Sequence, residues 1–381
     1  MASSLLHWDV MKPVKTVDNN DALKAALIEG ARLIDVRAPV EFTSTQIPGS
    51  LNHPILSTEE RSEVGTCYKQ QGAAAATHLG HQLVSGAVKS ERVLAWINAI
   101  EQQGASMLFC ARGGQRSRIA CEWLAEQGYQ LPRIEGGYKR IRQLLMAETT
   151  LLQPDQLLVL GGSTGVGKTV FLLEDSAFID LEGLANHRGS AFGASVSPQP
   201  AQSSFENSLA IALMQWRDAG PETLLLEDEG RLIGRLQVPP TLQGAMKQAP
   251  LVVLEANLET RIEHIYQEYI VHQLQAFNKA AGSEGFHRFS EYLVGALSKI
   301  HKRLGGDRYR MCEQQMRSAL IAHSAGDPEQ HKEWISLLLT DYYDPMYTHQ
   351  LSKKEDRMIF KGDIKAVRGF LAAYRRNQRD Q

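Results

Sequence analysis

The sequence predicts two α/β domains in one chain, followed by a helical extension at the C-terminus. In each half, an apolar strand runs into a glycine-containing loop and then into a helical pattern, the order typical of open parallel sheets. The 381 residues suffice for two to three domains, and the hydrophobic spacing from about residue 258 onwards is helical. We expect a first domain over 1–148 and a second over 149–381 with a basic helical extension at about 258–381. The boundary is expected within 148–156, where Pro154 interrupts regular structure.

Five elements of the first domain follow from apolar spacing and from glycines that end helices. They are a helix over 21–30, a strand over 33–36, a helix over 90–103, a strand over 106–109 and a helix over 117–127.

The loop between the last two elements carries the most informative cysteine. Cys110 is followed by Arg112, Gly113, Gly114 and Arg116. Successive backbone N–H groups at such a turn can bind an anion, and the helix N-terminus adds positive potential. Both effects favour the thiolate, which is the nucleophilic form of cysteine. We therefore expect Cys110 to be catalytic and the other four residues to form an anion-binding loop; the alternative is a small buried hydrophobe.

Several further segments of this domain occur in a characteristic order. They are Leu33–Arg37, Glu41-Phe42, Ile47–Ser50, the loop of Cys110 and Glu135–Tyr138. In order and spacing they resemble a rhodanese (sulfurtransferase) domain, and the resemblance implies sulfur or selenium carried on Cys110.

The loop is one residue longer than the common rhodanese loop, because Arg116 lies six positions after Cys110 rather than five. Cys-x5-Arg is the spacing of tyrosine and dual-specificity phosphatases, whose larger loop surrounds a phosphate. Two interpretations follow. The domain is a phosphatase-like module, or it transfers a chalcogen from a phosphate compound such as selenophosphate.

The second domain opens with an apolar strand over 157–160 and a phosphate-binding motif. Residues 162–169 fit G-x4-G-K-[ST], the Walker A P-loop, in the strand–loop–helix context that the motif requires. Its glycines let backbone N–H groups converge on phosphate oxygens, the lysine supplies a mobile cation and the threonine can ligate Mg²⁺. The expected phosphate-binding residues are Gly162, Ser163, Thr164, Gly165, Gly167, Lys168 and Thr169.

A second apolar strand, over 223–226, ends in acidic residues and resembles a Walker B strand. We expect Glu227 or Asp228 to be the metal acid, the alternative being an ordinary acidic loop. A third strand is expected over 251–255.

Basic residues gather in the last third of the chain, where residues 288–381 carry a net charge of +5 against −8 for residues 149–287. An amphipathic helix from Phe286 to Leu304 ends with Lys299, Lys302 and Arg303, which are candidate contacts to tRNA phosphates. A solvated helix end explains them equally well. His187 and Arg188 are candidate diphosphate or tRNA contacts in a polar, glycine-flanked stretch, and a structural role explains them equally well.

Composition excludes several other classes of protein. The four cysteines form no CxxC pair, so we expect no structural metal, no zinc and no haem. So few cysteines favour a reducing compartment. Residues 1–9 have neither a basic nor a long apolar run, and no stretch of 18 apolar residues occurs, so we expect a cytoplasmic protein without membrane association.

Few protein families combine a P-loop and a cysteine loop in one chain, and four segments reduce the number of candidate families further. They are residues 64–72, 110–117, 180–190 and 342–347. Together these features resemble the bacterial tRNA 2-selenouridine synthases over nearly the whole chain, and the longer cysteine loop is a feature of that family.

The resemblance implies a two-step reaction on 2-thiouridine at the wobble position of tRNAs for Lys, Glu and Gln. A geranyl group from geranyl diphosphate is first attached to the sulfur, and selenium from selenophosphate then replaces the S-geranyl group. We expect the P-loop to hold the diphosphate with Mg²⁺, Arg112 and Arg116 to hold selenophosphate, and Cys110 to accept or relay selenium. Selenophosphate synthase is a candidate donor source. The alternatives are a rhodanese-regulated P-loop ATPase or kinase, a sulfur-relay carrier and a phosphatase.

Overall fold

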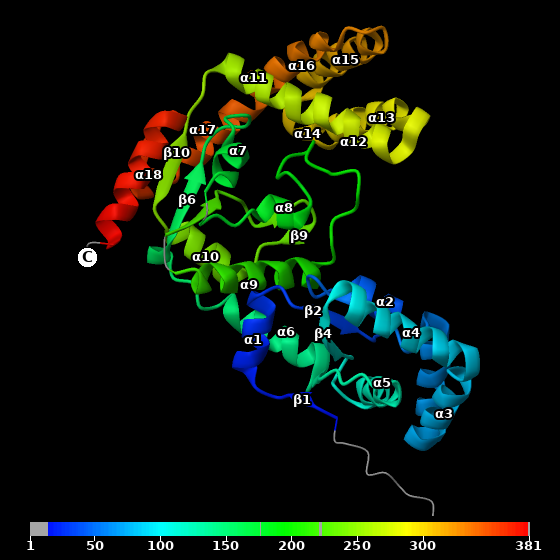
Figure 1. Ribbon diagram of the computed structural model, residues 1–381. Coiled ribbons are helices and arrows are strands. Elements are labelled where there is room, and N and C mark those ends of the chain that lie inside the picture. The colour runs from blue at the N-terminus through cyan, green and yellow to red at the C-terminus, as the bar shows by residue number, and fades with distance from the viewer. Residues whose placement is uncertain (1–13, 176, 221–222, 380–381) are drawn as a thin grey trace, which may run out of the picture. The chain divides into compact units, whose positions relative to one another are not determined.

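The computed structural model describes residues 14–175, 177–220 and 223–379, which form two compact units (Figure 1). Of the described residues, the first unit comprises 14–148 together with 206–214, and the second comprises those of 149–205 and of 215–379. Residues 1–9, on which the predicted cytoplasmic location partly rests, lie outside the described residues. Among the helices of the described ranges, none is long and apolar enough to span a membrane.

The first unit is built on a parallel sheet with the strand order β1-β5-β4-β2-β3. The strands are β1 (Thr16–Val17), β2 (Arg32–Asp35), β3 (Leu51–Asn52), β4 (Ala105–Phe109) and β5 (Arg133–Ile134). The two longest strands, β2 and β4, are buried at all but one position each because both of their faces are covered. This sheet confirms the predicted α/β fold of the first domain.

Helices cover both faces of this sheet. They are α1 (Asn20–Ile28), α2 (Pro39–Ser44), α3 (Thr58–Leu83), α4 (Gly86–Gln103), α5 (Gln115–Glu126) and α6 (Gly137–Glu148). Leu33 and Phe109 pack with α1, α6 and residues 210–214 on one face, whereas Ile34 and Leu108 pack with α4 and α5 on the other. The alternation follows from the two-residue period of strands. The sequence did not suggest α3, which is interrupted at Gly72 (φ 84°).

The second unit contains a four-stranded parallel sheet with the order β11-β10-β6-β7. Its strands are β6 (Leu157–Gly161), β7 (Leu224–Glu227), β10 (Leu251–Leu254) and β11 (Met358–Gly362), and a small hairpin is formed by β8 (Leu232–Ile233) and β9 (Leu236–Gln237). Leu160 pairs with Glu227, so the loop after β6 and the acids after β7 meet at the carboxyl edge of the sheet. The strands expected over 157–160, 223–226 and 251–255 are confirmed.

Helices make up most of the rest of this unit. They are α7 (Lys168–Leu173), α8 (Leu181–Ala185), α9 (Gln202–Asp218), α10 (Pro240–Gln248), α11 (Leu258–Tyr266), α12 (His272–Ala281), α13 (Gly285–Lys299), α14 (His301–Leu304), α15 (Gly306–Ser324), α16 (His331–Leu338), α17 (Asp344–Ser352) and α18 (Ile364–Arg379). Two π-helical turns, η2 (Gln267–Val271) and η5 (Leu339–Tyr343), join α11 to α12 and α16 to α17.

The C-terminal part is largely helical, as predicted, with one exception. Residues 358–362 form β11, which extends the sheet beside β10 rather than continuing a helix. The predicted amphipathic helix over 286–304 is present as α13 and α14, and Phe289, Leu293 and Leu297 are fully buried in the helical core.

Candidate functional site

The carboxyl end of β4 delivers Cys110 into a loop that leads directly to α5. Cys110 is buried, and its Sγ lies 3.3 Å from the Oγ of Ser117, which also contacts the Gly114 carbonyl oxygen at 3.1 Å. Within the described structure, the backbone N–H groups of residues 111–115 have no hydrogen-bond acceptor. Unpaired donors beside a helix N-terminus are the arrangement that can bind an anion.

Glycines allow a second chain segment to press against this loop. Gly113 (φ 62°) could not carry a side chain, because its Cβ would lie 2.5 Å from the backbone nitrogen of Gly136. Gly137 (φ 55°) would place a Cβ 2.1 Å from the Cys110 carbonyl oxygen. Tyr138 N–H donates to that same oxygen at 2.8 Å. The segment 135–138 of the rhodanese resemblance therefore fixes the path of the cysteine loop.

The two arginines of the loop differ in their surroundings. Arg116 donates to both carboxylate oxygens of Glu41, at 2.6 and 3.1 Å. Burial opposes ionisation of Glu41, but the hydrogen bonds from Arg116 outweigh it and hold the Glu41 pKa below its ordinary value. Arg112 is exposed and has no side-chain partner among the described residues. Arg116 is thus held in place, whereas Arg112 is free to reach an incoming anion.

The P-loop follows β6 and ends at the first turn of α7. Gly162 (φ 142°) passes so close to β10 that a Cβ would lie 2.5 Å from the Leu254 carbonyl oxygen, which excludes any side chain. In the described structure, the N–H groups of Ser163, Thr164, Gly165, Gly167, Lys168 and Thr169 have no acceptor. The predicted phosphate-binding residues therefore lie together in one loop with free donors.

Helix α11 supports the P-loop from outside. Arg261 Nε donates to the Thr164 carbonyl oxygen at 2.9 Å, and the same guanidinium is paired with Asp344. The ring of His264 hydrogen-bonds the Gly165 carbonyl oxygen at 2.8 Å. Because these contacts use carbonyl oxygens, they leave the N–H groups on the other side of the loop available.

Three carboxylates converge beside Lys168 and Thr169. Oxygen atoms of Glu182, Glu227 and Glu229 lie within 4.8 Å of one another. Thr169 donates to one oxygen of Glu227 at 2.9 Å, and the other oxygen is buried without a hydrogen-bond partner. The sequence indicated Glu227 but not Glu182 or Glu229, which come from α8 and from the end of the acidic run after β7.

Burial, together with the mutual repulsion of these carboxylates, makes their ionisation costly. It raises the pKa of Glu182 and of Glu229 to about 7 and that of Glu227 to about 8. Burial disfavours the charge of Lys168, but Tyr347 and the carboxylates outweigh it and keep the Lys168 pKa above its ordinary value. An orphaned buried oxygen within a set of hard oxygen donors fits a divalent cation such as Mg²⁺.

Asp228, the other acid suggested by the sequence, is engaged elsewhere. Its carboxylate is paired with Lys354 at 2.5 Å and with Arg357 at 3.4 Å. Both partners lie just before β11. Asp228 therefore links the start of β11 to the end of β7 through ion pairs.

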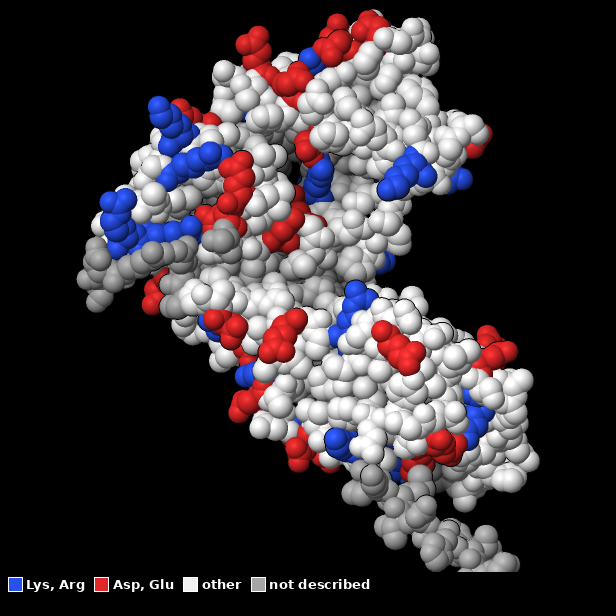
Figure 2. Space-filling view, in the orientation of Figure 1, with Lys and Arg blue, Asp and Glu red and all other residues white. Residues whose placement is uncertain are grey.

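The P-loop and the carboxylates line one cleft of about 470 Å³, visible as a hollow with charged side chains at its mouth (Figure 2). Three aliphatic side chains of the cleft, Val170, Leu173 and Leu232, are more than half exposed. The two π-helical turns contribute Tyr269 and Tyr343 to its wall. The cleft thus combines the free N–H groups of the P-loop with an apolar wall, and the sequence did not reveal that wall.

The remaining sequence candidates are spread over several places. Arg188 lines the cleft, where it pairs with Glu268 and lies 5.6 Å from the Tyr269 ring centroid, whereas the Nδ1 atom of His187 is buried without a partner. Lys299, Lys302 and Arg303 are exposed around the junction of α13 and α14, outside the cleft lining. Figure 2 shows a further gathering of Lys and Arg over α18.

A family model and individual relatives of this chain carry the same description. A family model described as the tRNA 2-selenouridine synthase AAA domain matches residues 155–378. The tRNA 2-selenouridine synthase of Hahella chejuensis (strain KCTC 2396) is 46% identical over 93% of this chain and 94% of its own. Those of Shewanella loihica (strain ATCC BAA-1088 / PV-4) and Pseudomonas putida (strain W619) are also 46% identical, over 91% and 92% of this chain and 94% and 97% of theirs.

Proposed function

This chain belongs to the tRNA 2-selenouridine synthases, and we propose on that basis how its two sites divide the reaction. The enzyme is a transferase that modifies tRNA and takes selenium from selenophosphate. We assign a geranylation step to the P-loop cleft and a selenium step to the Cys110 loop. The tRNAs for Lys, Glu and Gln are the proposed substrates, with selenophosphate synthase as donor source and the cytoplasm as location.

The P-loop cleft is proposed to bind geranyl diphosphate. The observation that carries this assignment is the combination of free backbone N–H groups around Lys168 with the exposed apolar wall of Val170, Leu173 and Leu232. A prenyl diphosphate has the same division into a charged head and an apolar chain. The thiouridine sulfur attacks the first carbon of the chain, the C–O bond breaks and the diphosphate leaves, while the nucleoside loses its N3 proton. Lys168 and the loop N–H groups stabilise the charge that develops on the diphosphate.

Mg²⁺ is the cation proposed for this cleft. Glu182, Glu227 and Glu229 would hold it, and Thr169 is adjacent through its hydrogen bond to Glu227. The orphaned Glu227 oxygen supports the assignment, since a buried carboxylate oxygen without a partner is otherwise costly. When bound, the cation supplies positive charge to the diphosphate leaving group.

The Cys110 loop is proposed to act in the second step. A thiocarbonyl sulfur is a poor leaving group, whereas the S-geranyl group leaves as a thiolate when selenium adds to C2 of the uridine. The N–H groups of 111–115 and the side chains of Arg112 and Arg116 would bind the phosphate part of selenophosphate. Cys110 is then the reactive group of this step.

Nucleoside analysis of tRNA tests this division. We expect 2-thiouridine tRNA and geranyl diphosphate to give the S-geranyl nucleoside without added nucleoside triphosphate, and later addition of selenophosphate to give 2-selenouridine. A requirement for ATP or GTP in the first step would contradict the P-loop assignment and favour an ATPase or kinase. Formation of 2-selenouridine without a geranylated intermediate would contradict the order of steps.

A further inference from the structure

The substitution at C2 of the uridine does not cleave the phosphorus–selenium bond of selenophosphate, so a further step must cleave it. Selenophosphate carries reduced, nucleophilic selenium bonded to phosphorus. When this selenium forms a bond to C2 and the C2–S bond breaks, geranyl thiolate leaves with the electron pair. Selenium then bridges C2 and phosphorus, and no atom has been oxidised or reduced. Release of 2-selenouridine therefore requires a phosphoryl transfer to another nucleophile.

The Cys110 loop has the parts of a phosphoryl-transfer site. Its five free N–H groups can surround the oxygens of a tetrahedral phosphoryl group. Arg116 lies six positions after Cys110, and Glu41 holds its guanidinium in a fixed orientation. The Cys110 thiol donates to the hydroxyl of the next residue, Ser117, at 3.3 Å, and this hydroxyl donates to the Gly114 carbonyl oxygen. Once Cys110 is a thiolate, the hydroxyl can turn to donate to it. A carrier of a single selenium atom needs neither the longer loop nor this hydroxyl.

We propose that Cys110 is a nucleophile toward phosphorus rather than a carrier of selenium. The Cys110 Sγ attacks phosphorus, the P–Se bond breaks, and 2-selenouridine leaves with the electron pair. Water then hydrolyses the phosphocysteine, which returns the thiol and releases inorganic phosphate. This inference rests on the proposed function, because it takes the selenium-bridged nucleoside from the second step.

The leaving group of this step needs no general acid, and the carboxylates near the loop are already paired with arginines. A phosphatase acting on an alkyl phosphate needs a general acid to protonate the departing alkoxide. The selenouridine anion is delocalised over N3, C2 and selenium, so it leaves without a proton donor. Close to the loop, Glu41 is paired with Arg116, and Asp35 accepts three side-chain hydrogen bonds from Arg37.

The direct test uses Cys110→Ala protein, selenophosphate and an anticodon stem-loop RNA that is already S-geranylated. We expect this variant to lose the geranyl group and to accumulate the selenium-bridged phosphonucleoside, detected by mass spectrometry after digestion. If the geranylated RNA stays unchanged with Cys110→Ala while the wild type converts it, the proposal is overturned and a carrier role is supported. If the wild type itself leaves this RNA unchanged, the proposed order of steps is wrong instead.

Ser117→Ala gives a second readout that is independent of overall activity. Loss of the hydroxyl removes one charge-assisted hydrogen bond from the departing thiolate, so hydrolysis of phosphocysteine should slow about ten- to hundredfold. Acid quenching and peptide mass spectrometry should then find phosphate on Cys110. Absence of phosphocysteine in both the wild type and Ser117→Ala during turnover would overturn the proposal.

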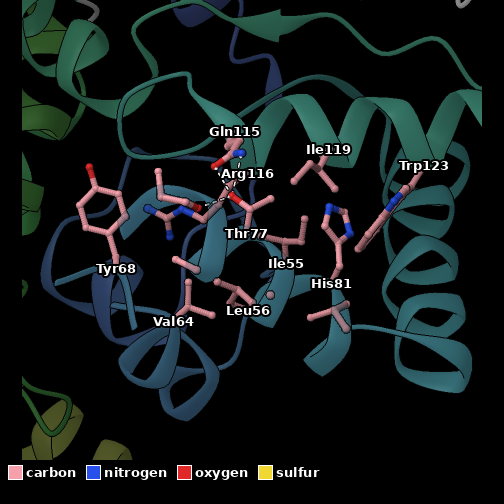
Figure 3. Close-up of a pocket in the computed structure, with 14 residues that line it drawn as sticks. Ile55, Leu56, Val64, Tyr68, Thr77, His81, Gln115, Arg116, Ile119 and Trp123 are labelled. Carbon is pink, nitrogen blue, oxygen red and sulfur yellow. Dashed lines mark hydrogen bonds between the residues drawn. The ribbon is translucent and has the colours of Figure 1, made fainter. Parts of the chain in front are cut away.

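A separate observation concerns a cavity of about 130 Å³ in the same unit (Figure 3). Side chains of α3 and α5 face each other across it. Ile55, Leu56, Val64 and Ile119 form apolar walls, and His81 and Trp123 stand edge to face at one end, 6.1 Å apart. Gln115 and Arg116 line it as well, so the cavity adjoins the cysteine loop. The space opens to solvent beside the exposed ring of Tyr68, so an apolar group can enter it.

We infer that this cavity receives the isoprenoid chain of the S-geranyl nucleoside during the selenium step, which again rests on the proposed function. An apolar cavity of about 150 Å³ binds benzene, so this one suits a single branched five-carbon unit. The second isoprene unit would then lie at the mouth, beside the exposed ring of Tyr68.

Two adjacent alanines of α3 give a matched test. Ala73 and Ala74 are both exposed, but only Ala73 lines the cavity. We expect Ala73→Phe to lower kcat/KM for an S-geranyl stem-loop RNA at least about tenfold in the selenium step, with Ala74→Phe unchanged. An S-methyl RNA should be converted equally by both variants. Equal rates of Ala73→Phe and Ala74→Phe on the S-geranyl RNA would overturn this inference, whereas failure of the wild type on that RNA would overturn the proposed function.

Discussion

Lys168 is the cation in closest contact with the P-loop backbone. Its Nζ donates to the Gly162 carbonyl oxygen at 2.7 Å, and the Tyr347 ring centroid lies 5.5 Å away. Replacing it with alanine should lower the rate of geranylation by about a hundredfold or more, because one fixed donor to the diphosphate is lost. The measurement is the rate of S-geranyl nucleoside formation, with Lys247→Ala on α10 as control. Unchanged geranylation would exclude a role for Lys168.

His331 predicts a pH dependence of stability in the helical part of the second unit. The ring is fully buried, Trp334 Nε1 donates to its Nδ1 at 2.9 Å, and its Nε2 lies 3.2 Å from the His323 Nδ1. Burial, and then the neighbouring His323, lower the His331 pKa to about 4. The unfolded chain takes up a proton near pH 6.5 whereas the folded chain does not, so stability falls as the pH drops from about 6.5 to 4.

The loss attributable to His331 should reach roughly 3 kcal/mol at pH 4. Denaturant unfolding of the wild type and of His331→Gln across this range checks it. The variant should show the shallower dependence on pH whatever its absolute stability, and equal slopes for the two proteins would refute the assignment.

At the residue scale, the sequence could reveal site residues that are neighbours along the chain. Residues 162–169 form one motif, so their position was predictable. The pairing of Arg116 with Glu41 joins residues 75 positions apart, and Glu182 reaches Glu227 from a different element. No local spacing encodes such contacts, because they form only when segments distant in the sequence fold together.

At the scale of elements, the cysteine loop depends on the turn at Gly113. Gly113 (φ 62°) and Gly104 (φ 70°) both have a left-handed backbone conformation. A Cβ added at Gly113 would collide with the Gly136 backbone nitrogen, whereas a Cβ added at Gly104 would meet no atom within 4 Å. We expect Gly113→Ala to abolish most of the selenium step while leaving geranylation intact, and Gly104→Ala to retain both activities. Assaying the two steps separately distinguishes these outcomes, and equal effects of the two substitutions would show that the close approach at Gly113 is unimportant.

There are physical reasons why some elements could not be predicted from the sequence. β11 is a five-residue edge strand in which half-buried and exposed positions alternate. It lies between helices, so its short pattern was lost within a helical region. The π-helical turns η2 and η5 insert one residue per turn into otherwise regular helices, and their sequences read as helix. Both turns contribute a tyrosine to the lining of the cleft, so this unpredicted feature shapes the cleft.

At the scale of the whole molecule, the basic surfaces allow a comparison of two candidate tRNA contacts. Lys365 and Arg376 on α18 are exposed and have no partner in the described structure, as is also true of Lys299 and Lys302. The pair that contacts phosphates should, when changed to glutamate, weaken tRNA binding and reduce the slope of log affinity against log salt by about one per contact. Binding titrations at several salt concentrations decide between the pairs. Unchanged slopes for both pairs would place the tRNA elsewhere.

The central claim is that one chain carries two chemically distinct centres for two consecutive steps. The most direct test is a time course of tRNA nucleosides for Lys168→Ala and Cys110→Ala, each given geranyl diphosphate and selenophosphate, with S-geranyl RNA supplied in a parallel reaction. We predict that Lys168→Ala leaves 2-thiouridine unreacted but converts S-geranyl RNA to 2-selenouridine, and that Cys110→Ala geranylates normally but forms no 2-selenouridine. Loss of both steps in either folded variant would contradict the account.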